Sequence, residues 1–82
     1  MSKLSESQKE EIRELLSDKS GHNIDKVLDD SKLEDDLDFD SLDLVDIVME
    51  LEKNFDISIP DDDYNNKITV QGVYEIVERY IQ

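Results

Sequence analysis

The sequence predicts an all-α fold, a small four-helix bundle made of three main helices and one short helix, with a long ordered loop after the first helix. Three observations predict this class. The apolar residues recur at helical rather than alternating spacing, the chain has only two glycines and one proline for turns, and 82 residues bury one modest core. We therefore expect residues 1–82 to form a single domain with no room for an enzyme cleft.

The first helix is expected from about Glu6 to about Lys19. Ser5 and Gln8 have the spacing of a capping box, in which each side chain accepts a hydrogen bond from the other residue's backbone N–H. Gly21 is the expected stop, because glycine readily takes the left-handed conformation found after helix ends. The face toward the core is apolar and consists of Ile12, Leu15 and Leu16.

The stretch from Ser20 to Asp40 is a long connection for so small a domain. It contains apolar residues at intervals, which predicts an ordered loop that packs across the bundle. The residues expected to make this contact are Ile24, Val27, Leu28, Leu33 and Leu37.

The second helix, from about Ser41 to about Asn54, has apolar residues on two faces. On a wheel of roughly 100° per residue, one group forms a complete core face: Leu44, Ile47, Val48, Leu51 and Phe55. An outer stripe of Leu42, Val45 and Met49 falls on the far side, where a surface helix is normally polar. Either the loop or the last helix covers this stripe, or the stripe binds partners with a border of acidic residues, Asp46, Glu50 and Glu52.

Two further helices are expected in the last third of the chain. Pro60 and the acidic run 61–63 predict a short helix that ends near Asn66, because acidic residues favour helix N-termini. Thr69 is the expected cap of the final helix. Its one-sided apolar stripe consists of Val70, Val73, Tyr74, Val77 and Ile81.

The charge of the chain restricts its partners. Nine basic residues against twenty-three acidic ones give a net charge of −14, which repels nucleic acid and anionic membranes and favours basic protein surfaces. The N-terminus lacks an apolar signal region, and no stretch is long and apolar enough to span a bilayer. We expect a cytoplasmic monomer that does not insert into membranes.

Ser41 stands at the expected start of the second helix, where a serine most often serves as the N-cap. A catalytic role is unfavourable, because a serine nucleophile needs a base and the only histidine, His22, lies in an expected surface turn without a visible orienting partner. An attachment point is better founded, since a phosphate ester would meet free N–H groups and the positive end of the helix dipole. Asp40 and Asp43 crowd the same end, so an attached anion should extend toward solvent.

Three segments together resemble the acyl carrier protein family: Asp40-Ser41-Leu42, residues 55–60 with the sequence Phe-Asp-Ile-Ser-Ile-Pro, and residues 67–70 with the sequence Lys-Ile-Thr-Val. The similarity covers nearly the whole chain and includes its acidity. It implies a freestanding, non-catalytic carrier. Ser41 would receive 4′-phosphopantetheine from coenzyme A through a phosphopantetheinyl transferase that uses a divalent metal. The imported thiol would explain why the chain has no cysteine.

The resemblance also implies a docking surface for acyl-transferring and chain-elongating synthase enzymes with basic patches. The apolar positions are the outer stripe, and the acidic positions are Asp40, Asp43, Asp46 and Glu52, with Glu50 on the border. Such carriers shelter growing chains beside the core face of the second helix. The pathway is either fatty acid biosynthesis or a specialised one such as polyketide assembly.

The chain departs from the family's usual pattern at Asp38, where glycine commonly follows the leucine. We expect the turn to form nevertheless, because aspartate tolerates a left-handed backbone better than most residues. The added charge beside Ser41 puts the choice of partner in doubt.

Two other classes of protein remain as alternatives. Asp36, Asp38 and Asp40 have the first ligand spacings of an EF-hand loop, but Ser41 and Ile47 replace its glycine and its glutamate, so we expect no metal site. The second alternative is an acidic helical interaction module without a prosthetic group.

Overall fold

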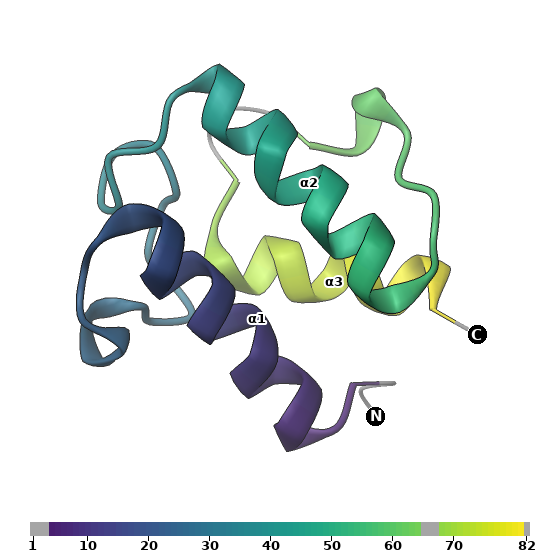
Figure 1. Ribbon diagram of the computed structural model, residues 1–82, viewed down its shortest axis with the longest axis horizontal. Helices are drawn as coiled ribbons and strands as arrows, with labels where there is room; N and C mark the ends of the chain where they lie inside the picture. The colour runs from purple at the N-terminus through teal and green to yellow at the C-terminus, as the bar shows by residue number, and fades with distance from the viewer. Residues whose placement is uncertain (1–3, 65–67, 82) are drawn as a thin grey trace.

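The computed structural model describes residues 4–64 and 68–81, which form three α-helices and two 3₁₀ turns (Figure 1). The order along the chain is α1 (Glu6–Ser20), η1 (Ile24–Lys26), α2 (Ser41–Phe55), η2 (Asp61–Asp63) and α3 (Val70–Tyr80). The all-helical prediction is confirmed, and the strand-like contact in these ranges is an isolated bridge between Lys32 and Thr69. Where the short fourth helix was expected, the described residues form only the three-residue 3₁₀ turn η2. The expected end of that helix at Asn66, motif residue Lys67 and N-terminal residues 1–3 lie outside the described residues.

Both ends of α1 follow the prediction. The Ser5 hydroxyl oxygen accepts a hydrogen bond from the Gln8 N–H at 3.1 Å, and Gln8 Oε1 accepts one from the Ser5 N–H at 2.9 Å. Gly21 takes φ +76° and ends the helix in the left-handed region. Ile12 and Leu16 are buried, whereas Leu15 is only half-buried.

The predicted cap and apolar face of α3 are also present. The Thr69 hydroxyl oxygen accepts a hydrogen bond from the Gly72 N–H at 3.0 Å. Ile76 is buried although it lies outside the predicted stripe, and Ile81 is half-buried just after the last turn. The remaining stripe residues are all buried, namely Val70, Val73, Tyr74 and Val77.

The loop between α1 and α2 is ordered and packs against the bundle, as predicted. Val27, Leu33 and Leu37 are buried, and Ile24 is half-buried. The prediction for Leu28 is wrong, because its side chain is 54% exposed. Helical periodicity carries no information about which residues of an irregular segment turn inward.

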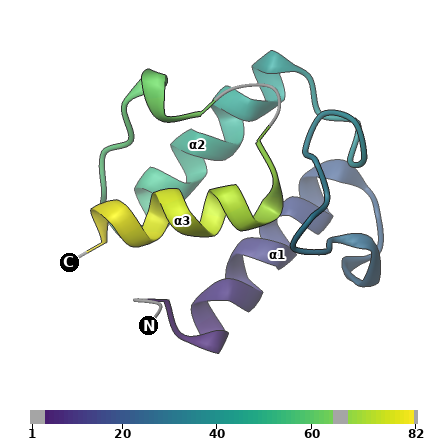
Figure 2. The same cartoon turned by 180° about the vertical axis from the view of Figure 1, so that it is seen from behind.

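Backbone hydrogen bonds join this loop to the start of α3. The Leu33 N–H donates to the Ile68 carbonyl at 3.0 Å, and the Val70 N–H donates to the Ser31 carbonyl at 2.9 Å. Ser31 is itself buried. The loop lies at the end of the bundle where α1 ends and α2 begins, and the view from behind shows it beside the start of α3 (Figure 2).

Candidate functional site

The start of α2 is held by a reciprocal pair of aspartates. Asp40 is the N-cap, and its Oδ1 accepts a hydrogen bond from the Asp43 N–H at 2.9 Å. Asp43 Oδ2 accepts one from the Asp40 N–H at 3.1 Å. The expectation that Ser41 caps this helix is therefore wrong. Aspartate caps a helix as well as serine does, and here the residue one position earlier takes that role.

Ser41 consequently occupies the first helical position with its side chain exposed. Its hydroxyl makes no hydrogen bond to the residues that the structure describes. A helix start leaves four N–H groups without intrahelical partners, and the capping box satisfies those of Asp40 and Asp43. The N–H groups of Ser41 and Leu42 therefore have no hydrogen-bond partner among the described residues, and they lie at the same helix end as the Ser41 hydroxyl.

The outer stripe of α2 is uncovered. Leu42 is 80% exposed, Met49 60% and Val45 44%. The interpretation in which the loop or α3 covers the stripe is therefore wrong. The opposite face of α2 contributes Leu44, Ile47 and Leu51 to the core, while Val48 and Phe55 are partly buried at its margin.

The acidic residues along α2 have different surroundings. Asp46 is exposed, and its Oδ2 lies 3.4 Å from Lys19 Nζ of α1. Glu52 is half-buried, and its Oε2 accepts a hydrogen bond from the Ile59 N–H at 2.8 Å, which fastens the segment after α2. Glu50 is half-buried as well. Glu52 is thus held by a backbone hydrogen bond, whereas Asp46 is held only by an exposed ion pair.

Comparison with known proteins identifies the family. The sequence model of the phosphopantetheine attachment site matches residues 10–77. An acyl carrier protein of Chlorobium phaeobacteroides is 42% identical over 69 residues, which cover 84% of this chain and 88% of the relative. Those of Akkermansia muciniphila and Buchnera aphidicola are 40% and 33% identical over 70 residues, or 85% of this chain and 88% and 90% of the relatives. The chain belongs to the acyl carrier protein family.

Acyl carrier proteins are carriers without catalytic activity of their own, and their prosthetic group is covalently attached 4′-phosphopantetheine. The surroundings of Ser41 fit such a group. The hydroxyl is exposed and makes no hydrogen bond to the described residues, so a phosphodiester there would break no existing contact. The free N–H groups of Ser41 and Leu42 suit an adjacent anion.

The interpretation of His22 as a residue without an orienting partner is wrong. His22 does have an orienting partner, because its Nε2 lies 3.2 Å from Asp38 Oδ2.

The EF-hand pattern is not assembled: Asp36 Oδ2 accepts a hydrogen bond from the Lys32 N–H at 2.7 Å, whereas Asp40 caps α2. Among the described residues no group of three possible metal ligands is found, nor a helix that is long and apolar enough to cross a bilayer.

The expected turn at Asp38 forms. This residue takes φ +64°, and the prediction that aspartate can stand in the left-handed region is confirmed. Asp56 takes a similar conformation, φ 54°, where α2 ends.

An apolar cavity lies behind α2 in the part of the carrier that the structure describes. Leu44, Ile47 and Leu51 line it from α2, and Val73 and Ile76 line it from α3. Its volume is about 10 Å³, which is close to the space for one water molecule. The cavity therefore has no room for an acyl chain unless its lining residues move apart.

Sequence reasoning missed two features around this site. The first is the role of Asp40 as cap, for which the Asp-x-x-Asp spacing with Asp43 was an available signal. The second is the contact between His22 and Asp38, which are 16 residues apart and meet only because of the path of the loop.

Proposed function

We propose that Ser41 carries the 4′-phosphopantetheine arm and that this chain holds acyl groups as thioesters for partner enzymes of fatty acid biosynthesis. In this proposal residues 1–82 form one carrier domain, which acts as a monomer in the cytoplasm. The supporting observation is the exposed Ser41 hydroxyl at the first position of α2, directly beside an uncovered apolar stripe.

In the attachment step, Ser41 Oγ forms a bond to the phosphorus of the pantetheine phosphate of coenzyme A. The bond from that phosphorus to the bridging oxygen breaks, and the nucleotide part leaves. No described residue hydrogen-bonds to the Ser41 hydroxyl, so its proton goes to a base of the transferase. Once attached, the group supplies a thiol on a flexible arm, which presents acyl groups at high effective concentration to a docked enzyme.

The outer stripe supplies the apolar part of docking in this proposal. Leu42, Val45 and Met49 would contact the partner, and Met49 adapts to surfaces of different shape. The acidic residues Asp40, Asp43, Asp46, Glu50 and Glu52 would steer basic patches toward this face, which raises the association rate more than the affinity. The ion pair of Asp46 with Lys19 is exposed and weak, so a basic side chain of a partner can replace Lys19.

The test is the intact mass of the protein after incubation with coenzyme A, magnesium ion and a phosphopantetheinyl transferase. Wild type should gain one phosphopantetheine, and Ser41→Ala should gain none. Ser58→Ala provides a matched control, because Ser58 is also exposed but lies after α2. Attachment to the Ser41→Ala protein would exclude Ser41 as the site, and unmodified wild type would leave the acidic interaction module as the better interpretation.

The pathway is tested with the loaded carrier. A fatty acid condensing enzyme should elongate its acyl group faster than a polyketide condensing enzyme does at equal enzyme concentration. The reverse order would assign the carrier to a specialised pathway.

A further inference from the structure

Asp38 has an unusual backbone conformation close to the modification site. It takes φ +64°, a value that residues with a side chain rarely adopt. It lies three positions before Ser41. Its neighbours Leu37 and Phe39 are both buried. Because these two residues are held in the core, the conformation of Asp38 determines how the chain leaves the core and enters α2.

The backbone of the flanking residues is fixed on the inner side. The Phe39 N–H donates to the Leu33 carbonyl at 3.0 Å, and the Leu37 N–H donates to the Lys32 carbonyl at 3.2 Å. On the outer side the Asp38 side chain itself is 78% exposed. Its carboxylate therefore depends on one further contact to be held in place.

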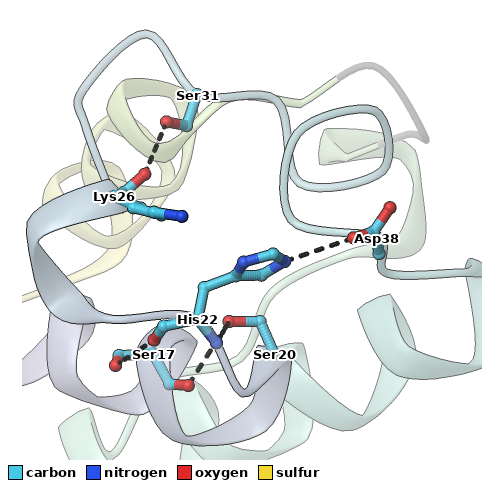
Figure 3. A network of polar contacts seen from close by, with 6 residues as sticks. All are labelled: Ser17, Ser20, His22, Lys26, Ser31 and Asp38. Atoms are coloured by element: carbon cyan, nitrogen blue, oxygen red, sulfur yellow. Dashed lines mark hydrogen bonds and ion pairs between the residues drawn. The ribbon is translucent and has the colours of Figure 1, made fainter.

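That contact comes from His22, two residues after the end of α1. His22 Nε2 lies 3.2 Å from Asp38 Oδ2, within hydrogen-bond distance when Nε2 carries the proton (Figure 3). The backbone of His22 is fixed on both sides: the Ser17 hydroxyl donates to its carbonyl at 2.7 Å, and its N–H donates to Ser20 Oγ at 3.1 Å. The backbone that carries the imidazole is thus held independently of the ring, and the ring points toward Asp38.

We infer that His22 is a positioning residue for the modification of Ser41. Its ring holds the Asp38 carboxylate on the outer side of the turn, stabilises the left-handed conformation there, and so fixes where the Ser41 hydroxyl is presented. This inference rests on the proposed function of Ser41. It predicts that His22 affects the step in which the hydroxyl reacts and not the docking of the transferase, because neither His22 nor Asp38 belongs to the outer stripe.

The decisive experiment is a double-mutant cycle of His22→Ala and Asp38→Gly, with the kinetics of phosphopantetheine transfer as the readout. His22→Ala should lower kcat by roughly twofold to fivefold, the range of one exposed ion pair, with KM unchanged. Asp38→Gly removes the carboxylate that His22 contacts, and glycine takes the left-handed conformation without that contact. In the Asp38→Gly background, His22→Ala should then have no effect.

Two controls distinguish positioning from general damage. Asn23→Ala changes the next residue, whose side chain makes no capping hydrogen bond, and should leave kcat unaltered. His22→Gln keeps a neutral donor and should recover part of the loss. An unchanged kcat in His22→Ala would overturn the inference. An equal loss of kcat from His22→Ala in the wild-type and Asp38→Gly backgrounds would also overturn it.

A second measurement separates this inference from the proposed function. In the Ser41→Ala protein, where no modification is possible, the backbone scalar coupling and chemical shifts of residue 38 should change on His22→Ala. Unchanged values would overturn the inference. If wild type is never modified but residue 38 responds to His22, the proposed function fails while the structural role of His22 stands.

Discussion

The two faces of α2 have similar apolar composition but opposite surroundings. Leu44, Ile47 and Leu51 are at most 4% exposed on the inner face, whereas Leu42, Val45 and Met49 lie open on the outer face. Burial of apolar area stabilises a fold, so only the inner residues contribute that stabilisation. The outer residues have no such role in the isolated carrier, and this supports the proposal that they contact a partner.

The largest expected effect comes from truncating one leucine on each face. Leu51→Ala should lower the free energy of unfolding by about 3 kcal/mol, because it removes a buried side chain and leaves a cavity. Leu42→Ala is the matched control and should change it by less than about 0.5 kcal/mol. Urea denaturation of both variants measures the difference, and equal losses would contradict the comparison of the two faces.

The next prediction extends the contrast to the two tyrosines of α3. Burial raises the pKa of Tyr74 to about 12. Since the unfolded chain loses this proton near pH 10, the stabilisation is complete below that pH and is lost as the pH rises from about 10 to about 12. The loss should amount to about 2 kcal/mol.

Tyr74→Phe is the control for this alkaline loss. Its free energy of unfolding should fall less steeply over the same pH range, measured by urea denaturation at each pH. The titration of half-buried Tyr80, whose hydroxyl donates to Asp63, is common to both proteins and cancels. Parallel pH profiles of the two proteins would contradict the prediction.

A third prediction concerns the outer face alone. Met49→Glu or Val45→Lys should reduce kcat/KM for acyl transfer by a partner synthase roughly tenfold, which corresponds to about 1.4 kcal/mol and is typical of a central interface residue. Helical content should stay constant, because both side chains are exposed. Unaltered transfer by both variants would exclude the outer stripe from docking.

The smallest effect separates the cap of α2 from its modification site. Asp40→Ala should lower the free energy of unfolding by about 1 kcal/mol, since it removes the N-cap. Ser41→Ala should change it by less than about 0.5 kcal/mol, because the exposed hydroxyl makes no hydrogen bond to described residues. Thermal denaturation compares the two, and a larger loss for Ser41→Ala would reverse the assignment of the cap.

Much of the fold could be predicted because its signals are local. The Ser5 and Thr69 caps, the Gly21 stop and the apolar faces of α1 and α3 all depend on residues within a few positions of one another. The exposed stripe of α2 was visible on a helical wheel, but its exposure was not, because that depends on where the loop and α3 pack.

The features that sequence reasoning missed depend on choices between near neighbours or on distant contacts. Asp40 and Ser41 are both good caps, and periodicity cannot distinguish a shift of one residue at a helix start. The exposure of Leu28 and the contact of His22 with Asp38 follow from the path of an irregular loop. No local pattern determines that path.

The backbone hydrogen bonds between the loop and the start of α3 have a consequence for how the molecule opens. The amide protons of Leu33 and Val70 belong to segments almost forty residues apart in the chain, yet they are protected by the same junction. When the loop detaches from α3, both protons become accessible to solvent together. Their protection factors in hydrogen–deuterium exchange should therefore be similar, and both report the free energy of opening this junction.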